Sequence, residues 1–188
     1  MGDEEFDAFF SVSYSRLVGQ LYALTGGWAE ARETVLEAFT RAWAHRARFD
    51  LQVEADSWIH TVAWNLAGSR RREPGAEEPY RVAFVEALRG LGREQRRAMV
   101  LHHLCRRDVA DIAAETGVSP AAVRAHLARG RAAVAAASGD GSHSTVERLV
   151  DELYDLVNQH AYPRLSPDQV RERSRRSATI RFRRAVRS

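Results

Sequence analysis

The segment "DVADIAAETGVSPAAVRAHLARGR", residues 108–131, contains two short runs of apolar residues at helical spacing, one on each side of a turn. In the first run, Val109 and Ile112 fall on one face of a helix. In the second run, Val123 and Leu127 lie four residues apart, which again places them on one face. The segment therefore predicts two short helices packed against each other.

The turn between these helices has the residues that a tight helical corner requires. Gly117 can adopt the left-handed conformation that ends a helix, and Val118 can fill the corner. Ser119 can cap the second helix with its hydroxyl. The proline that follows it is favoured at the first position of a helix. Asp108 can cap the first helix in the same way. This pattern is typical of a helix-turn-helix.

The second helix of this pair carries small and basic side chains on its outer face. Arginine can donate two hydrogen bonds to the groove edge of guanine, and alanine allows the backbone to approach DNA closely. A hairpin that only fills a core needs no such cluster. The segment therefore predicts a DNA-binding helix. The candidate DNA-binding residues are Ser119, Ala121, Arg124, His126, Arg129 and Arg131.

The rest of the chain also reads as helix, and no segment shows the period-two alternation of strands. Breaks rich in glycine, proline and serine occur at "REPGAEEPYR" and at "SGDGSHS". We therefore predict an all-α fold of two small helical domains. The predicted parts are a first domain at 1–73, a linker at 74–85, a helix-turn-helix domain at 86–138 and a C-terminal extension at 139–188.

Within the first domain, two boundaries can be predicted from local signals. Thr25-Gly26-Gly27 is expected to end the first helix. Residues 50–55 are expected to form a loop, and Asp56 or Ser57 to cap a helix that begins at Trp58.

The extension divides into an amphipathic helix and a basic tail. A helix at 145–159 has an apolar stripe that must be buried, either against the two domains or against another protein. The tail from Asp168 to Ser188 has eight arginines and two acidic residues. We predict that it is disordered alone, or ordered only against a partner.

The charge of the chain is unevenly distributed. Of 28 basic and 25 acidic residues, residues 1–73 hold 8 and 11, and both 74–138 and 139–188 hold 10 and 7. A basic second half fits a nucleic-acid partner. Cys105, the single cysteine, permits no internal disulfide, and neither a signal pattern nor a long apolar run is present. We therefore expect a cytoplasmic protein without a membrane span.

The sequence offers no active site. It lacks a phosphate-binding glycine loop, a Cys-x-x-Cys pair and a nucleophile elbow. His102, His103 and Cys105 can each bind metal, but neighbouring histidines on a helix point about 100° apart and do not form a tight ligand set. We expect neither an enzyme, nor a metal, nor a cofactor.

Two parts of the chain resemble bacterial RNA polymerase sigma factors. "DIAAETGVSPAAVRAHLARGR" resembles the helix-turn-helix of sigma region 4, and "LRGLGREQRRAMVLHH" resembles the helix before it. "AEARETVLEAFTRAW" and "DSWIHTVAWNLAGSRRR" resemble two helices of region 2. The order of these parts and the absence of a region 3 domain are similar to the extracytoplasmic-function group. The resemblance implies core RNA polymerase, through its beta-prime and beta subunits, and promoter DNA as partners, and leaves an anti-sigma factor open.

The resemblance also implies a role for each part of the chain. The helix-turn-helix would bind the −35 element of a promoter. The helix that follows Ser57 would hold the −10 element, where melted DNA needs aromatic and cationic side chains. The candidates for −10 binding are Trp58, Trp64, Asn65, Arg70, Arg71 and Arg72. The candidates for polymerase binding are Glu33, Leu36, Glu37, Thr40 and Arg41.

Several of these positions have other interpretations, and some depart from the family. At least one of Trp58 and Trp64 can belong to the core, and the arginines at 70–72 can be a solvated helix end. Leu36 replaces a glutamine of the family pattern, and Ser69 replaces an aspartate. Two further functions therefore remain open: a sigma-like regulator that binds polymerase without opening promoters, and a plain helix-turn-helix regulator.

Overall fold

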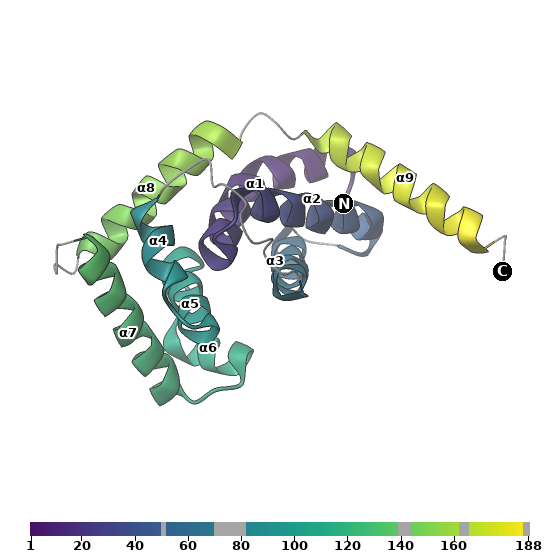
Figure 1. Cartoon of the computed structure of the whole chain (residues 1–188). Coiled ribbons are helices and arrows are strands. Elements are labelled where there is room, and N and C mark those ends of the chain that lie inside the picture. Colours follow the sequence, from purple (N-terminus) through teal and green to yellow (C-terminus); the bar gives the residue numbers. More distant parts are fainter. Residues whose placement is uncertain (50–51, 70–81, 139–143, 162–165, 186–188) are drawn as a thin grey trace.

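The protein is all-helical in the computed structural model, which describes residues 1–49, 52–69, 82–138, 144–161 and 166–185 (Figure 1). The elements are α1 (Asp3–Thr25), α2 (Trp28–His45), η1 (Arg46–Arg48), α3 (Gln52–Ser69), α4 (Ala83–Arg89), α5 (Arg93–Met99), η2 (Val100–Leu104), α6 (Val109–Thr116), α7 (Pro120–Ser138), α8 (Ser144–Ala161) and α9 (Pro167–Ala185). No strand occurs in these ranges, so the predicted fold class is confirmed.

Helices α1, α2 and α3 form the N-terminal unit. Its centre is aromatic: the ring of Phe39 lies 4.8 Å from that of Phe10 and 6.2 Å from that of Phe6. All three side chains are fully buried. As predicted, α1 ends at Gly26, whose φ of 73° allows its amide to donate to the Tyr22 carbonyl at 2.8 Å. These aromatic contacts fix α2 against α1.

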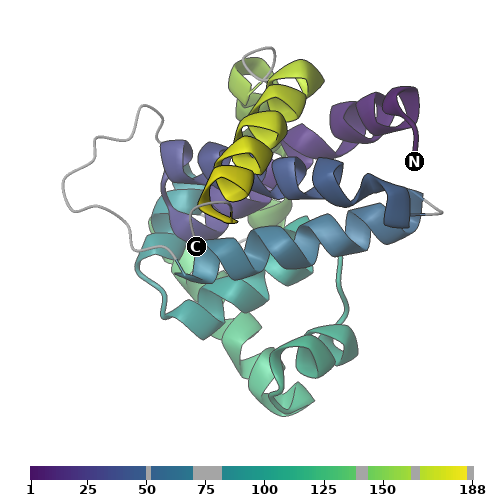
Figure 2. The same ribbon diagram turned by 90° about the vertical axis from the view of Figure 1, so that its right-hand side faces the viewer.

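The helix-turn-helix unit consists of α4 to α7. Both predicted caps are present, since the Asp108 carboxylate accepts from the Asp111 amide at 2.8 Å and the Ser119 hydroxyl from the Ala122 amide at 3.2 Å. Gly117 ends α6 with a φ of 72°. The hairpin of α6 and α7 lies at the lower edge of the molecule in Figure 2, and α7 also packs on α4, α5 and α8. The predicted helix-turn-helix is confirmed.

The two units are joined by the side chain of Arg96. Its guanidinium donates to the carbonyls of Leu88, Arg89 and Leu91 at 2.9–3.3 Å, and to the Leu24 carbonyl of α1 at 3.1 Å. Carbonyls at the end of a helix have no partner within the helix. Arg96 therefore supplies donors to the ends of α1 and α4 together, and so ties the two units to each other.

A second link between the units involves the carbonyl of Leu104 at the end of η2. It accepts from Gln20 Nε2 of α1 at 3.4 Å and from the Tyr154 hydroxyl of α8 at 3.2 Å. Gly19 makes this approach possible, because a Cβ atom there would lie 3.2 Å from the Tyr154 ring. One carbonyl thus joins α1, η2 and α8.

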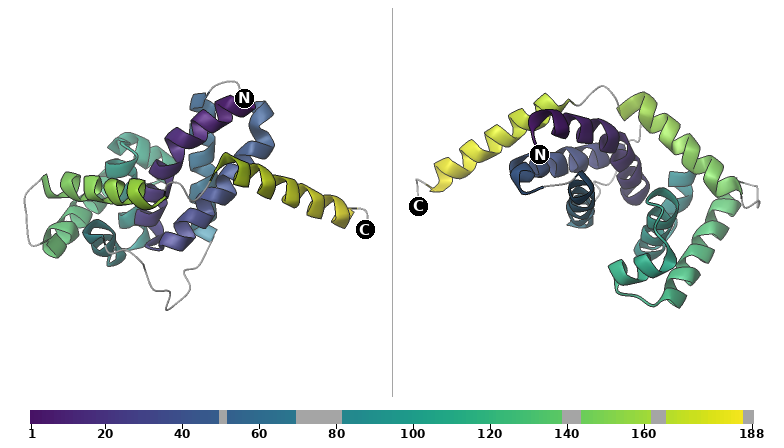
Figure 3. Two further views of the ribbon diagram at one scale, coloured as in Figure 1. Left: turned by 90° about the horizontal axis from the view of Figure 1, so that it is seen from above. Right: turned by 180° about the vertical axis from the view of Figure 1, so that it is seen from behind.

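The apolar stripe of α8 is buried within the chain. The stripe contacts α1 and α4, α7 and η2 of the helix-turn-helix unit. Its buried residues are Val146, Leu149, Val150, Leu153 and Val157. Of the two interpretations that the sequence left open, the structure supports packing against the two domains. Together α8 and α9 extend over the N-terminal unit and the helix-turn-helix unit (Figure 3).

The prediction of a disordered C-terminal tail is wrong. Residues 167–185 form α9, which packs on α2. Val170 is fully buried, and Ser174 is 8% exposed. These small and apolar residues sit four apart on one face, and the acidic side chains of the N-terminal unit neutralise the arginines between them. The composition of the tail alone does not show the surface of α2 on which α9 packs.

The predicted start of the third helix is also wrong. Helix α3 begins at Gln52, so Asp56 and Ser57 lie inside it and do not cap it. The Asp56 carboxylate instead accepts from the Ser13 hydroxyl at 3.1 Å and forms an ion pair with Arg16 of α1. Because α3 begins one turn earlier, Asp56 is free to bind α1 and does not cap a helix end.

Replacing Arg96 with methionine should lower the free energy of unfolding by about 2–3 kcal/mol, because methionine retains an apolar stem but leaves four carbonyls without their charged donor. Urea denaturation followed by circular dichroism measures the change. Arg93→Met, at an exposed position of the same helix, should stay within about 0.5 kcal/mol of wild type. Equal effects of the two substitutions would contradict this role of Arg96.

Candidate nucleic-acid and protein interfaces

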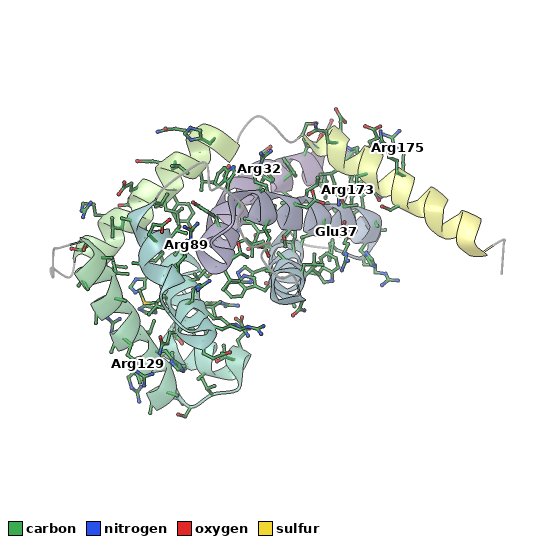
Figure 4. All side chains as sticks on the ribbon, in the orientation of Figure 1. Arg32, Glu37, Arg89, Arg129, Arg173 and Arg175 are labelled. Atoms are coloured by element: carbon green, nitrogen blue, oxygen red, sulfur yellow. The ribbon has the colours of Figure 1, made fainter. Side chains whose placement is uncertain are left out.

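The outer face of α7 carries the residues predicted to contact double-stranded DNA. The buried residues Val123 and Leu127, at 1% and 2% exposed, fix which face of α7 points inward. Their burial leaves Arg124 and Arg129 exposed to solvent, and Figure 4 shows Arg129 on α7 in the lower part of the view. Ser119 and Ala121 are also exposed, while His126 and Arg131 are half-buried.

The arginines of α7 have no acidic partner in the part of the chain that the structure describes. Arg124, Arg129 and Arg131 form no ion pair there. In contrast, Arg97 of α5 binds the Glu115 carboxylate at 3.3 Å. Unpaired cationic side chains along an exposed, small-residue helix face can bind phosphate and base edges.

Two histidines, His103 and His126, lie partly buried in the helix-turn-helix unit. Burial, with smaller contributions from the nearby His102 and Arg131, lowers the pKa of His103 to about 4. The Nδ1 atom of His126 is buried without a hydrogen-bond partner among the described residues. Burial therefore favours the neutral form of His103 at neutral pH.

The residues predicted for melted DNA do not gather at one place on α3. The ring of Trp58 lies 5.3 Å from that of Phe49, at the end near η1. Trp64 is 8% exposed and faces the helix-turn-helix unit, where the Arg97 guanidinium lies 5.6 Å from its ring centre. Asn65 is exposed. The expectation that at least one tryptophan belongs to the core is thus confirmed for Trp64.

The remaining −10 candidates, Arg70 to Arg72, lie outside the described residues. Beside Trp64, the two units meet at His60 and Cys105, whose ring nitrogen and sulfur are 3.4 Å apart. Burial lowers the pKa of His60 and raises the pKa of Cys105 to about 12, so both groups are favoured in their neutral forms.

The five residues predicted to bind polymerase lie along α2. The acidic members are Glu33 and Glu37, and Arg41 binds the Glu37 carboxylate at 2.9 Å. Leu36 is partly buried against the core. Thr40 is 5% exposed, and its hydroxyl donates to the Leu36 carbonyl at 2.8 Å. The exposed polar part of this face is therefore made by Glu33, Glu37 and Arg41.

Residues of α9 that the sequence did not predict lie on this face. The Arg173 guanidinium donates to Glu33 at 2.5 Å and lies 3.4 Å from the Glu37 carboxylate. Figure 4 shows Arg173 beside Glu37, while Arg175 lies on the far side of α9. These carboxylates raise the pKa of Arg173, although partial burial opposes them. Val170, Ser174 and Ser177, spaced as on one helix face, were the signal for this contact.

Among the described residues, no group of three or more His, Cys, Asp or Glu side chains could hold a metal ion. No helix in the described part of the chain is long and apolar enough to cross a membrane.

Comparisons with known proteins agree with this arrangement. Residues 9–77 match the family model for sigma-70 region 2, and residues 81–134 match that for sigma-70 region 4. Among solved structures, the chain is similar to the sigma factor RpoE from Bartonella quintana, crystallised with the anti-sigma factor NepR. The TM-score is 0.57 at 16% identity, over 72% of this chain and 98% of that chain. No curated protein matches the chain significantly.

The two matches occur in the order of the family and lie on the two helical units described above. The chain therefore belongs to the sigma-70 family of sigma factors. This is a family of non-enzymatic transcription factors.

The stability of the protein should decrease as the pH falls from about 6.5 to about 4, because His103 binds a proton in the unfolded chain but not in the folded one. The His103→Gln substitution removes this contribution. Thermal unfolding between pH 4 and pH 7 should therefore depend less steeply on pH in the variant, with His60 retaining part of the effect. Parallel curves for the two proteins would contradict the lowered pKa of His103.

Proposed function

We propose that this protein binds core RNA polymerase and directs it to selected promoters. In this proposal α7 binds the −35 element, α3 contributes to the −10 element, and the outer face of α2 binds the beta-prime subunit. The observation that carries the proposal is the exposed face of α7. It has arginines at 124, 129 and 131 that form no ion pair with the described residues, and the exposed alanine at 121.

The −35 part of the proposal follows from the position of Arg124. In a helix-turn-helix, residues near the start of the second helix contact base edges in the major groove. Arg124 is the fifth residue of α7, is exposed and lies one turn beyond Ala121. We propose that Arg124 reads a base, and that Ser119, His126, Arg129 and Arg131 contact the DNA around it.

The −10 part requires a change of arrangement. Trp58 and Asn65 are accessible at least in part, but Trp64 is covered by Arg97 of the other unit. A stacked base needs an exposed aromatic face. We therefore propose that Trp64 takes part only when the two units separate on polymerase, with Arg70 to Arg72 contacting phosphate.

The proposed partners are core polymerase, promoter DNA and an anti-sigma factor. The anti-sigma factor is supported by the similarity to RpoE, whose structure is a complex with NepR. A second function is favoured by a different observation: Glu33 and Glu37 on α2 are already bound by Arg173. With this face occupied, the protein could act as a sigma-like regulator that does not open promoters.

Run-off transcription with core polymerase from the source organism, on fragments of its genomic DNA, separates these functions. Discrete transcripts that depend on the protein are expected. Arg124→Ala should reduce them by weakening promoter discrimination by about 1–3 kcal/mol, since one bidentate base contact is lost. Core binding should be unchanged in this variant.

The matched control is Arg148→Ala, which removes an exposed arginine from α8 and should leave transcription unchanged. Binding to core without transcripts from any fragment would favour the regulator. Failure to bind core, combined with specific binding to DNA, would leave only the plain helix-turn-helix function.

A further inference from the structure

Helix α9 binds the same face of α2 that we propose for polymerase. Of the five candidate docking residues, Glu33 and Glu37 both contact Arg173, and Arg41 is bound to Glu37. The outward carboxylates of this face are therefore occupied within the molecule. A protein that binds the same carboxylates has to compete with Arg173.

The contact is a built interface and not a single ion pair. Val170 is fully buried and Ser174 is 8% exposed, so one face of α9 is packed. Arg171 forms ion pairs with Asp7 of α1 and, at 2.8 Å, with Asp168 of its own helix. Its guanidinium also lies 4.8 Å from the centre of the Trp43 ring of α2. Packing, charge and a cation–π contact thus act at neighbouring positions.

The charges of the two helices explain why α9 occupies this place. The tail from Asp168 to Ser188 has eight arginines and two acidic residues, whereas residues 1–73 have three more acidic than basic residues. Complementary charge selects a partner and orients it more than it adds affinity. The acidic face of α2 is therefore matched by a basic helix of the same chain.

We infer that α9 is an internal competitor of RNA polymerase, which masks the docking face of α2 through Arg173 and must leave it before polymerase binds. This inference rests on the proposed function of the α2 face. It assigns the C-terminal extension a regulatory role: α8 fixes the extension to both units, and α9 covers the docking face.

The strength of the contact suits a reversible mask. The side chains of Arg173 and Glu33 are 33% and 44% exposed, and ion pairs that solvent reaches are individually weak. The connection compensates for this weakness, because α9 begins six residues after α8 ends. A short tether gives an effective concentration on the order of millimolar, so α9 rebinds readily until a larger partner displaces it.

The test uses the full-length chain with one charge reversed. Arg173→Glu places a carboxylate beside Glu33 and Glu37 and should release α9. The matched control, Arg176→Glu, makes the same change on the same helix, where the side chain is 74% exposed and, among the described residues, is bound to Glu172 of α9 itself. Circular dichroism verifies that both variants keep their helices.

Two measurements are made on wild type and both variants. Hydrogen–deuterium exchange of residues 167–177 reports whether α9 is docked. Titration of each protein with purified core polymerase reports affinity. If α9 is docked about 90% of the time, its release should tighten the apparent Kd by about tenfold. Arg173→Glu should show faster exchange and tighter binding, and Arg176→Glu should match wild type in both.

Three results would overturn the inference. Faster exchange in Arg173→Glu with unchanged or weaker binding means that α9 does not compete with polymerase. Unchanged exchange and unchanged binding mean that Arg173 does not hold α9 in place. Absence of core binding by all three proteins overturns the proposed function itself, and the inference with it, which distinguishes that failure from the other two.

Discussion

The structure depends on how the carbonyls at the junction of its two units find donors. The helices α1 and α4 end side by side, and each leaves carbonyls that the helix itself cannot satisfy. Arg96 donates to both ends, and the Leu104 carbonyl accepts from Gln20 and Tyr154. Because these donors belong to different elements, neither unit can move without breaking bonds to the other. This constraint holds the sigma-like units together and buries Trp64 between them.

The C-terminal extension completes the same arrangement. The apolar stripe of α8 covers α1 and parts of the helix-turn-helix unit, so α8 reinforces the junction from one side. Helix α9 then reaches the opposite end of the N-terminal unit, where Arg171 and Arg173 meet the acidic side chains of α1 and α2. The uneven charge of the sequence thus appears in the structure as an internal contact. The arginines of α7 form no ion pair within the described residues, and they belong to the face that we propose for DNA.

Local signals predicted the elements whose stability is mainly local. The helix-turn-helix was predictable because its caps, its left-handed glycine and its apolar spacing all lie within 24 consecutive residues. The start of α3 was not predictable in this way. Asp56, which looks like a cap from its neighbours alone, pairs instead with Arg16, 40 residues away. The tail was not predictable either, because Arg171 and Arg173 are paired with acidic residues near the other end of the chain. For Trp64, the sequence left two interpretations open, a place in the core and a role in −10 binding.

The sequence by itself determined the all-α fold, the helix-turn-helix, the family and the apolar stripe of α8, because spacing, capping and motif order are properties of neighbouring residues. Only the tertiary structure decided that the two units are joined, that α9 is ordered and that it lies on α2. These outcomes depend on pairs such as Arg173 with Glu33, which are 140 residues apart. Complementary charges in a sequence do not specify their partners; the packing that brings two helices together does.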